Sequence, residues 1–269
     1  MTQHLQFWLE GKEVHRELPD PEETLMSGVT WGHHWAVFTP AYWLSQMWMA
    51  ALHKGSRAPY VARGTLDEEL VFCMLGGFGI TAELATSAFE ACAAANLISE
   101  RVVGAASWEE TLSRPMNVNG KFIRDRYPRA KAKYLASAMT YLREKAIDVS
   151  SGRAMRDSLL PIPGVGPKTA GWVARNYLDS DDVAILDIHL IRAGLLCDLF
   201  NPNQRIERDY FAMEARFIEF CGRLGARPAV LDCLIWDQMR VLGKTAIEVL
   251  AARSSVSADK PRSRRSIAA

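Results

Sequence analysis

The chain has 269 residues, of which 49% are hydrophobic and 23% are charged, and its formal net charge is +1. This length and composition are typical of a globular protein with one large or two small domains. No apolar run reaches the length of a membrane span, no signal peptide opens the chain, and the five scattered cysteines form no CxxC pair. These features exclude a membrane protein, a disulfide scaffold and a cysteine-based zinc site, and they predict a cytoplasmic location.

Residues 1–60 are predicted to form an N-terminal extension. Residues 5–18 alternate loosely around a Gly-Lys pair, which predicts a short β-hairpin. Pro40 opens a long apolar helix that is rich in tryptophan, and core packing explains most of these tryptophans best. The neighbouring histidines His33 and His34 lack acidic or cysteine residues nearby, so we do not interpret them as a metal site.

Helical patterns dominate residues 61–253, which we predict to be the core of the protein. The first helix has a capping box, with Thr65 as the N-cap and Glu68 three residues later. The predicted helices cover residues 65–75, 81–98, 129–145, 153–160, 169–177, 188–200, 207–222 and 227–241. Residues 254–269 are polar and basic, and we expect a disordered tail there. The fold is therefore predicted to be mainly α, with a small N-terminal β appendage.

Positive charge is concentrated in residues 121–175, which hold twelve lysines and arginines but only four acidic residues, a net charge of +8. Lys131 and Lys133 lie in the middle of this segment, on a predicted helix. Such a concentration on a nearly neutral chain suggests a surface that faces a polyanion such as DNA. A set of solvated helix faces explains the same pattern equally well.

The stretch IPGVGPKTA, residues 162–170, joins two predicted helices. Gly164 and Gly166 flank Val165 and allow positive φ and close approach, so backbone N–H groups of this turn can meet a phosphate. The pattern predicts a helix-hairpin-helix element, and a plain tight corner between helices is the alternative. Lys168 follows at the start of the next helix, where a cation is disfavoured by about 0.3–1 kcal/mol. Either this side chain turns to solvent, or the site needs its amine uncharged.

Asp187 follows an apolar run and precedes a predicted helix, nineteen residues after Lys168. In that position an aspartate commonly serves as a helix N-cap. A fixed carboxylate combined with a lysine amine also suits chemistry at the anomeric carbon of a sugar. Departure of a base leaves an oxocarbenium-like sugar, which a carboxylate stabilises.

The hairpin, Lys168 and the LDIH stretch that contains Asp187 together resemble the helix-hairpin-helix Gly/Pro-Asp superfamily of DNA glycosylases. A lysine at this hairpin position resembles the bifunctional branch, which excises 8-oxoguanine. The stretches LVFCMLGGFGITAEL, RYPRAKAKYL and LDCLIW are similar to the compact archaeal-type members, and the resemblance spans about residues 66–244. It implies a two-lobed helical fold, damaged duplex DNA as the partner, and a nucleoid-associated monomer.

The resemblance also implies roles for individual residues. Lys168 would be the Schiff-base nucleophile and Asp187 the catalytic carboxylate of a DNA glycosylase that is also an abasic-site lyase. His189 would position the DNA backbone, and Asp232 and Trp236 would contact the flipped base. Other features of the sequence suggest the remaining contacts. The charge pattern suggests Lys131 and Lys133 for DNA, and the glycine loop suggests Phe78 for the base. The hairpin suggests three further DNA contacts, Gly164, Val165 and Gly166. Core packing is the alternative for Trp236, and a loop anchor is the alternative for Phe78.

Two features bear on specificity and cofactors. Met74 stands where the family pattern has a polar glutamine near the glycine loop, which leaves the damaged base less defined than the reaction type. The iron–sulfur cluster of other branches needs four closely spaced C-terminal cysteines, which Cys221 and Cys233 cannot supply. We therefore expect no iron–sulfur cluster and no other cofactor, although a monovalent cation at the hairpin would be compatible.

Two alternative functions remain open from the sequence. The first is a helix-hairpin-helix module that holds DNA within a repair assembly without catalysis. Retention of both Lys168 and Asp187 argues against it, because phosphate binding by the hairpin requires neither. The second is a monofunctional glycosylase for another damaged base, in which Lys168 would be incidental.

Overall fold

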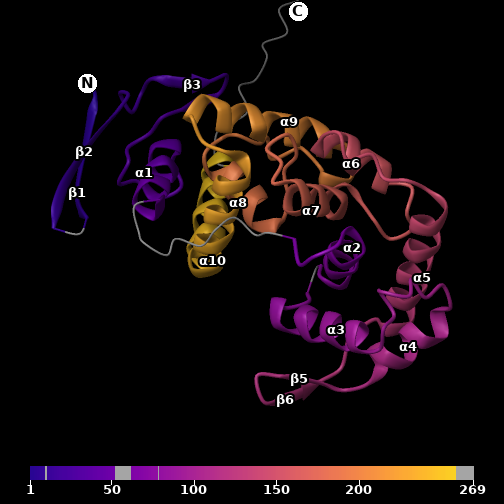
Figure 1. Ribbon diagram of the computed structural model, residues 1–269. Helices are drawn as coiled ribbons and strands as arrows, with labels where there is room; N and C mark the ends of the chain where they lie inside the picture. The colour runs from indigo at the N-terminus through magenta and orange to yellow at the C-terminus, as the bar shows by residue number, and fades with distance from the viewer. Residues whose placement is uncertain (10, 52–61, 78, 259–269) are drawn as a thin grey trace, which may run out of the picture. The chain divides into compact units, whose positions relative to one another are not determined.

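The computed structural model describes residues 1–9, 11–51, 62–77 and 79–258 of the chain (Figure 1). Helices dominate this part, and the β-structure consists of three short antiparallel pairs. The helices are α1 (Pro40–Ala51), α2 (Leu66–Leu75), α3 (Ala82–Ala94), α4 (Ala105–Ser113), α5 (Pro128–Glu144), α6 (Gly152–Leu159), α7 (Pro167–Leu178), α8 (Ile188–Leu196), α9 (Ile206–Leu224) and α10 (Pro228–Ala258). The strands are β1 (Gln3–Leu9), β2 (Lys12–Leu18), β3 (Thr24–Met26), β4 (Val29–Thr30), β5 (Met116–Val118) and β6 (Lys121–Ile123). The prediction of a mainly helical fold with an N-terminal β appendage is confirmed.

The chain divides into two compact units that alternate along the sequence. The first unit contains β1–β4, α1, α8, α9 and α10 from Val230 onward. The second unit contains α2–α7 and the pair β5–β6. This division differs from our predicted boundary near residue 60, because the N-terminal elements share a unit with α8–α10.

Side-chain hydrogen bonds hold the N-terminal region within the first unit. The hydroxyl of Tyr42 on α1 donates to Oε1 of Gln238 on α10 at 2.6 Å, and Gln238 donates back to Oε1 of Gln46 at 3.0 Å. Arg216 on α9 donates to the carbonyl of Ser27, between β3 and β4, at 2.6 Å. The N-terminal region is thus built into the unit that also carries α8.

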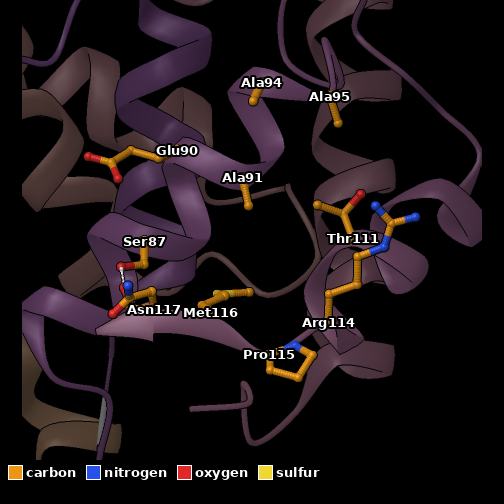
Figure 2. Close-up of a pocket in the computed structure, with 10 residues that line it drawn as sticks. All are labelled: Ser87, Glu90, Ala91, Ala94, Ala95, Thr111, Arg114, Pro115, Met116 and Asn117. Atoms are coloured by element: carbon orange, nitrogen blue, oxygen red, sulfur yellow. Dashed lines mark hydrogen bonds between the residues drawn. The ribbon is translucent and has the colours of Figure 1, made fainter. Parts of the chain in front are cut away.

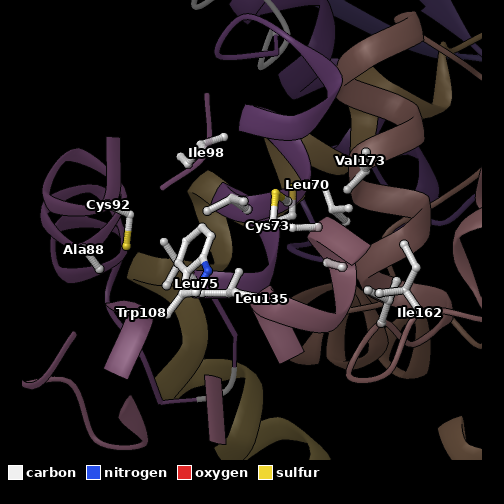
Figure 3. Close-up of a cluster of buried hydrophobic side chains, with 14 of the residues drawn as sticks. Leu70, Cys73, Leu75, Ala88, Cys92, Ile98, Trp108, Leu135, Ile162 and Val173 are labelled. Carbon is white, nitrogen blue, oxygen red and sulfur yellow. The ribbon is translucent and has the colours of Figure 1, made fainter. Parts of the chain in front are cut away.

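A hydrophobic cluster from α2–α7 and β5 forms the core of the second unit (Figure 3). Leu70, Trp108 and Met139 are fully buried in it. The indole of Trp108 donates its N–H to the carbonyl of Val102 at 2.8 Å, so this large side chain is buried without leaving a donor unpaired. The predicted capping box at Thr65 and Glu68 is present and begins α2, which supplies much of this core.

A buried carboxylate connects α2 with α7. Glu69 is 0% exposed, and its Oε1 accepts a hydrogen bond from Nδ2 of Asn176 on α7 at 2.6 Å. Oε1 also accepts from the thiol of Cys73 at 3.3 Å, and Oε2 accepts from the backbone N–H of Arg63 at 2.9 Å. Arg175 donates to Oδ1 of the same asparagine at 3.0 Å. This network fixes α7 to α2 in the buried part of the unit.

Lys131 belongs to a second buried polar cluster. Its ammonium donates to Oδ2 of Asp125 at 2.6 Å and to the carbonyl of Leu75 at 2.8 Å, and its side chain is only 12% exposed. The side chain of Asp125 is 0% exposed and also accepts from the N–H of Tyr127 at 2.8 Å. Because the fold uses this ammonium, we no longer propose Lys131 as a phosphate contact. Lys133 lies on the exposed side of the same helix.

Several other features differ from the predictions. Helix α10 continues to Ala258, so our predicted helix 227–241 was too short and residues 254–258 of the expected tail are helical. Residues 259–269 and Phe78 lie outside the described residues. Helix α4 and the pairs β3–β4 and β5–β6 were not predicted. Among the helices described, none is long and apolar enough to cross a bilayer.

Replacing Lys131 with methionine should lower the free energy of unfolding by about 3–5 kcal/mol, because the buried carboxylate of Asp125 would lose its cation. The matched variant Lys133→Met removes an exposed ammonium from the same helix and should change stability by less than about 0.5 kcal/mol. Urea denaturation measures both effects. Equal stability of the two variants would contradict the assignment of Lys131 to the interior.

Candidate functional site

Helices α6 and α7 form a helix-hairpin-helix element within the second unit. Between them, the N–H of Val165 donates to the carbonyl of Ile162 at 3.0 Å, and Val165 is buried in the core. Gly164 has a φ of 85°, and a Cβ there would lie 2.6 Å from Cγ of Tyr134 on α5. Only glycine therefore fits at this position, because the turn lies directly against α5.

The exposed end of the hairpin presents the start of α7. Gly166 is the N-cap of α7, has no side-chain cap, and would have open space around an added Cβ. The N–H of Ala170 makes a hydrogen bond to the carbonyl of Gly166 at 2.9 Å. The N–H groups of Lys168 and Thr169 precede this bond, and helix geometry leaves them directed out of the helix start. This arrangement suits an anion such as phosphate.

Lys168 is the second residue of α7 and is half-buried. Burial and the neighbouring Glu69 carboxylate raise the pKa of the Cys73 thiol well above its usual range, while Arg175 and Lys168 oppose that increase. The lysine stands at the edge of the core, at the hairpin that could hold a phosphate.

Asp187 caps α8 in the first unit, as its position in the sequence predicted. Its Oδ1 accepts hydrogen bonds from the N–H groups of both His189 and Leu190 at 2.9 Å. In the described part of the chain, its Oδ2 accepts no hydrogen bond. The cap therefore orients the carboxylate through one oxygen and leaves the other available to a ligand.

His189 and Trp236 form an aromatic pair in the first unit. Their ring centroids are 6.4 Å apart with an interplanar angle of 83°, and the guanidinium of Arg240 lies 4.7 Å from the Trp236 ring centre. Nδ1 of His189 is buried and has no hydrogen-bond partner among the residues described. Trp236 is half-buried, whereas Asp232, one turn earlier on α10, is only 5% exposed. The structure thus places side by side two residues that the sequence predicted separately, His189 as a DNA contact and Trp236 as a base contact.

The predicted base-contacting loop is only partly described. Phe78 lies outside the described residues. Met74 is half-buried at the end of α2 and packs against the hydrophobic core of the second unit. The outcome for Phe78 is therefore still a prediction.

The basic segment does not form a single charged surface. Five of its cations are bonded within the fold, namely Lys131, Arg143, Arg153, Arg156 and Arg175. Five others are exposed and lie between β6 and the middle of α5, and we call them the β6–α5 basic surface: Lys121, Arg124, Arg126, Arg129 and Lys133. The fold therefore uses part of this charge internally, and the five exposed cations are the candidates for contact with a polyanion.

Two pockets among the described residues are lined by neither Lys168 nor Asp187. One, of about 530 Å³, lies between α3, the end of α4 and β5 (Figure 2). Another, of about 660 Å³, follows α8 around Asn201 in the first unit. Neither pocket contains a sequence-predicted site residue, and no group of three or more possible metal ligands occurs among the described side chains. We therefore assign neither pocket to the reaction.

Comparison with known proteins supports the resemblance seen in the sequence. The family model described as 8-oxoguanine DNA glycosylase, with a helix-hairpin-helix, matches residues 61–226. The crystal structure of the 8-oxoguanine DNA glycosylase of Methanocaldococcus jannaschii is similar at 25% identity, covering 64% of this chain and 76% of that one, with a TM-score of 0.49. The corresponding enzyme of Thermotoga maritima matches at 24% identity over 64% and 77% of the chains, with a TM-score of 0.48. No curated protein sequence matches the chain.

The cap at Asp187 predicts a difference between two substitutions. Asp187→Ala removes the acceptor for two backbone N–H groups and should lower the free energy of unfolding by about 0.5–2 kcal/mol. Asp187→Asn keeps an oxygen in the same place and should remain close to the parent protein. Thermal denaturation of the three proteins measures this difference, and equal loss in both variants would show that the charge rather than the cap matters for stability.

Proposed function

Because this chain belongs to the 8-oxoguanine DNA glycosylase family with a helix-hairpin-helix motif, we propose that it excises 8-oxoguanine from duplex DNA and then cleaves the abasic strand. The observation that carries the proposal is the position of Lys168, directly after a phosphate-binding type of turn and at the edge of the core. A turn of this kind would bring DNA to the lysine, which supplies an amine for covalent chemistry.

In the proposed reaction the neutral amine of Lys168 attacks C1′ of the damaged nucleotide. The bond between C1′ and the base breaks, and the base leaves with the bonding electrons and takes up a proton. The C1′–O4′ bond then breaks, O4′ takes up the second amine proton, and an imine forms between Lys168 and C1′. Removal of a C2′ proton then allows β-elimination, in which the C3′–O bond breaks and the strand is cut.

Activation of Lys168 requires loss of its proton before attack. The helix N-terminus disfavours the ammonium by at most about 1 kcal/mol, which alone is too little. Removal of water by bound DNA would supply most of the rest, as for other lysines that form imines. The half-buried position of Lys168 suits this mechanism, because part of the side chain is already removed from water.

Asp187 is proposed to stabilise the cationic sugar. Its Oδ1 is held by two backbone N–H groups of α8, which keep the side chain in one orientation. Its Oδ2 is then available to the sugar, where developing positive charge favours a fixed carboxylate. The same oxygen can take and return protons as the base leaves and the imine forms.

DNA and base contacts complete the proposal. The hairpin Gly164–Gly166 and the start of α7 would bind one phosphate, and the β6–α5 basic surface, including Lys133, would bind others. His189, with a buried Nδ1 that has no partner in the described part of the chain, would position the backbone beside α8. Trp236 would stack on the extruded base, while the buried Asp232 would act at the base edge.

Lys168→Gln should abolish excision of 8-oxoguanine and all covalent trapping by borohydride, while duplex affinity changes less than about threefold. The reason is that the hairpin binds phosphate through backbone groups, which the substitution leaves in place. The measurement combines strand incision, borohydride reduction and peptide mapping of the cross-link on an 8-oxoguanine duplex.

Two matched variants sharpen this test. Lys133→Gln removes an exposed lysine of α5 and should trap normally but bind DNA more weakly. Asp187→Asn keeps the helix cap and should fold normally yet slow the chemical step. A cross-link on another lysine would overturn the role of Lys168, and excision without any cross-link would favour a monofunctional glycosylase.

Trp236→Ala should weaken binding of a duplex that contains 8-oxoguanine more than binding of the undamaged duplex, by about fivefold or more. Base extrusion costs a few kcal/mol, and stacking on the indole offsets part of that cost. The control is Trp35→Ala in the same unit. Trp35 has an exposed indole that stacks on His33. Equal losses on damaged and undamaged duplexes would show that Trp236 has only a structural role.

A further inference from the structure

The pair β5–β6 presents an aromatic side chain to solvent within the second unit. Its turn consists of Asn119 and Gly120, with φ values of 51° and 80°, which is the geometry of a two-residue hairpin turn. Phe122 on β6 pairs with Asn117 on β5 and is 77% exposed. Such exposure leaves a large apolar surface in water, which argues for a partner that covers it.

The strand that pairs with β6 is firmly attached to the core. Met116 and Val118 of β5 are buried in the hydrophobic cluster of the second unit. The hydroxyl of Ser87 on α3 donates to the carbonyl of Asn117 at 3.1 Å, as Figure 2 shows. Because side chains alternate along a strand, this attachment turns Asn117, and with it Phe122, away from the core. The exposed ring is therefore held on a fixed support.

The charges around Phe122 identify the kind of partner. Lys121 and Arg124 lie within two residues of it in the sequence, and both are exposed members of the β6–α5 basic surface. Between residues 115 and 134 the single acidic residue is Asp125, which is buried and paired with Lys131. An aromatic ring among exposed cations, without an exposed acid between them, is complementary to nucleic acid.

We propose that the β5–β6 hairpin is a second DNA-contacting element of this enzyme. Phe122 packs against the apolar faces of sugars and bases in a groove, while Lys121 and Arg124 bind the phosphates beside it. This inference rests on the proposed function, because its ligand is the duplex on which the enzyme acts. It adds a contact that neither the helix-hairpin-helix turn nor the proposed base pocket provides.

Helix α5 relates this hairpin to the phosphate-binding turn. It begins at Pro128, five residues after β6, and Tyr134 on the same helix lies against Gly164 of the turn. Because α5 follows β6 and also contacts the turn, Phe122 and the phosphate-binding turn belong to one unit and should contact the same duplex at separate positions.

The first test measures affinity for a duplex with a tetrahydrofuran abasic analogue across a series of salt concentrations. Phe122→Ala should weaken binding about tenfold, with an unchanged slope of log K against log salt, because it removes an apolar contact only. The double variant Lys121→Gln/Arg124→Gln should lower the slope by about two, one for each lost phosphate contact. Denaturation midpoints should not change, since all three side chains are exposed.

The matched control is Trp8→Ala. Trp8 is likewise an exposed aromatic residue on a two-stranded hairpin, but it pairs with Glu13 across the strands. This variant should bind the same duplex with parent affinity. If Trp8→Ala and Phe122→Ala weaken binding equally, or if Phe122→Ala has no effect, the proposal is wrong.

The second test places the contact on the DNA. A single 2-aminopurine is moved along the abasic-analogue duplex, and its fluorescence change on binding is recorded for the parent protein and for Phe122→Ala. One position separate from the abasic analogue should lose its response in the variant, while the others keep theirs. Identical profiles for both proteins would overturn the proposal. Excision of 8-oxoguanine by the parent protein is scored separately, so failure of the proposed function and failure of this contact give different results.

Discussion

The candidate site depends on the buried carboxylate of Glu69. Burial of a carboxylate is costly unless hydrogen bonds replace the water that it loses. Here the side chain of Asn176, the thiol of Cys73 and the backbone N–H of Arg63 supply those bonds. Two of these three groups come from segments other than α2, so the carboxylate is satisfied only when α7 is in place.

This constraint acts at the N-terminal end of α7, where Lys168 lies, as well. Asn176 lies two turns beyond Lys168 on a helix with 1.5 Å rise per residue, which places the lysine about 12 Å from the anchor. Val165, buried at the turn, and Gly164, in contact with Tyr134, fix the other end. A helix held at both ends presents its first N–H groups and its lysine in one geometry, which is what phosphate binding and attack at a sugar carbon require.

Much of this arrangement could be predicted from the sequence because it depends on local rules. The capping box at Thr65, the hairpin glycines and the cap at Asp187 each follow from a few neighbouring residues, and all three are present. The hairpin β5–β6 carried a local signal as well, the Asn119-Gly120 turn between short apolar stretches, but we did not predict it. Phe122 was missed with it.

Other features depend on tertiary contacts that no local pattern contains. Lys131 and Lys133 look equivalent in the sequence, yet they are two residues apart on a helix and so point to nearly opposite sides. One meets the buried Asp125 and the other faces solvent. The N-terminal elements likewise belong to a unit whose other members begin at α8, a relationship set by long-range bonds such as that between Tyr42 and Gln238. Charge counts and segment boundaries therefore predicted less than turns and caps did.

The cap formed by Asp187 and the catalytic role that we propose for it are compatible, because each uses a different oxygen of the carboxylate. If both oxygens capped the helix, approach of a cationic sugar would compete with the N–H groups for the same lone pairs, and each role would weaken the other. Two N–H groups instead converge on Oδ1 and fix the orientation of the side chain. The orientation that stabilises α8 thus leaves Oδ2 without a hydrogen bond among the described residues. The carboxylate of Asp187, held by the cap, would then need no rearrangement to stabilise positive charge. Such preorganisation is the condition for electrostatic catalysis.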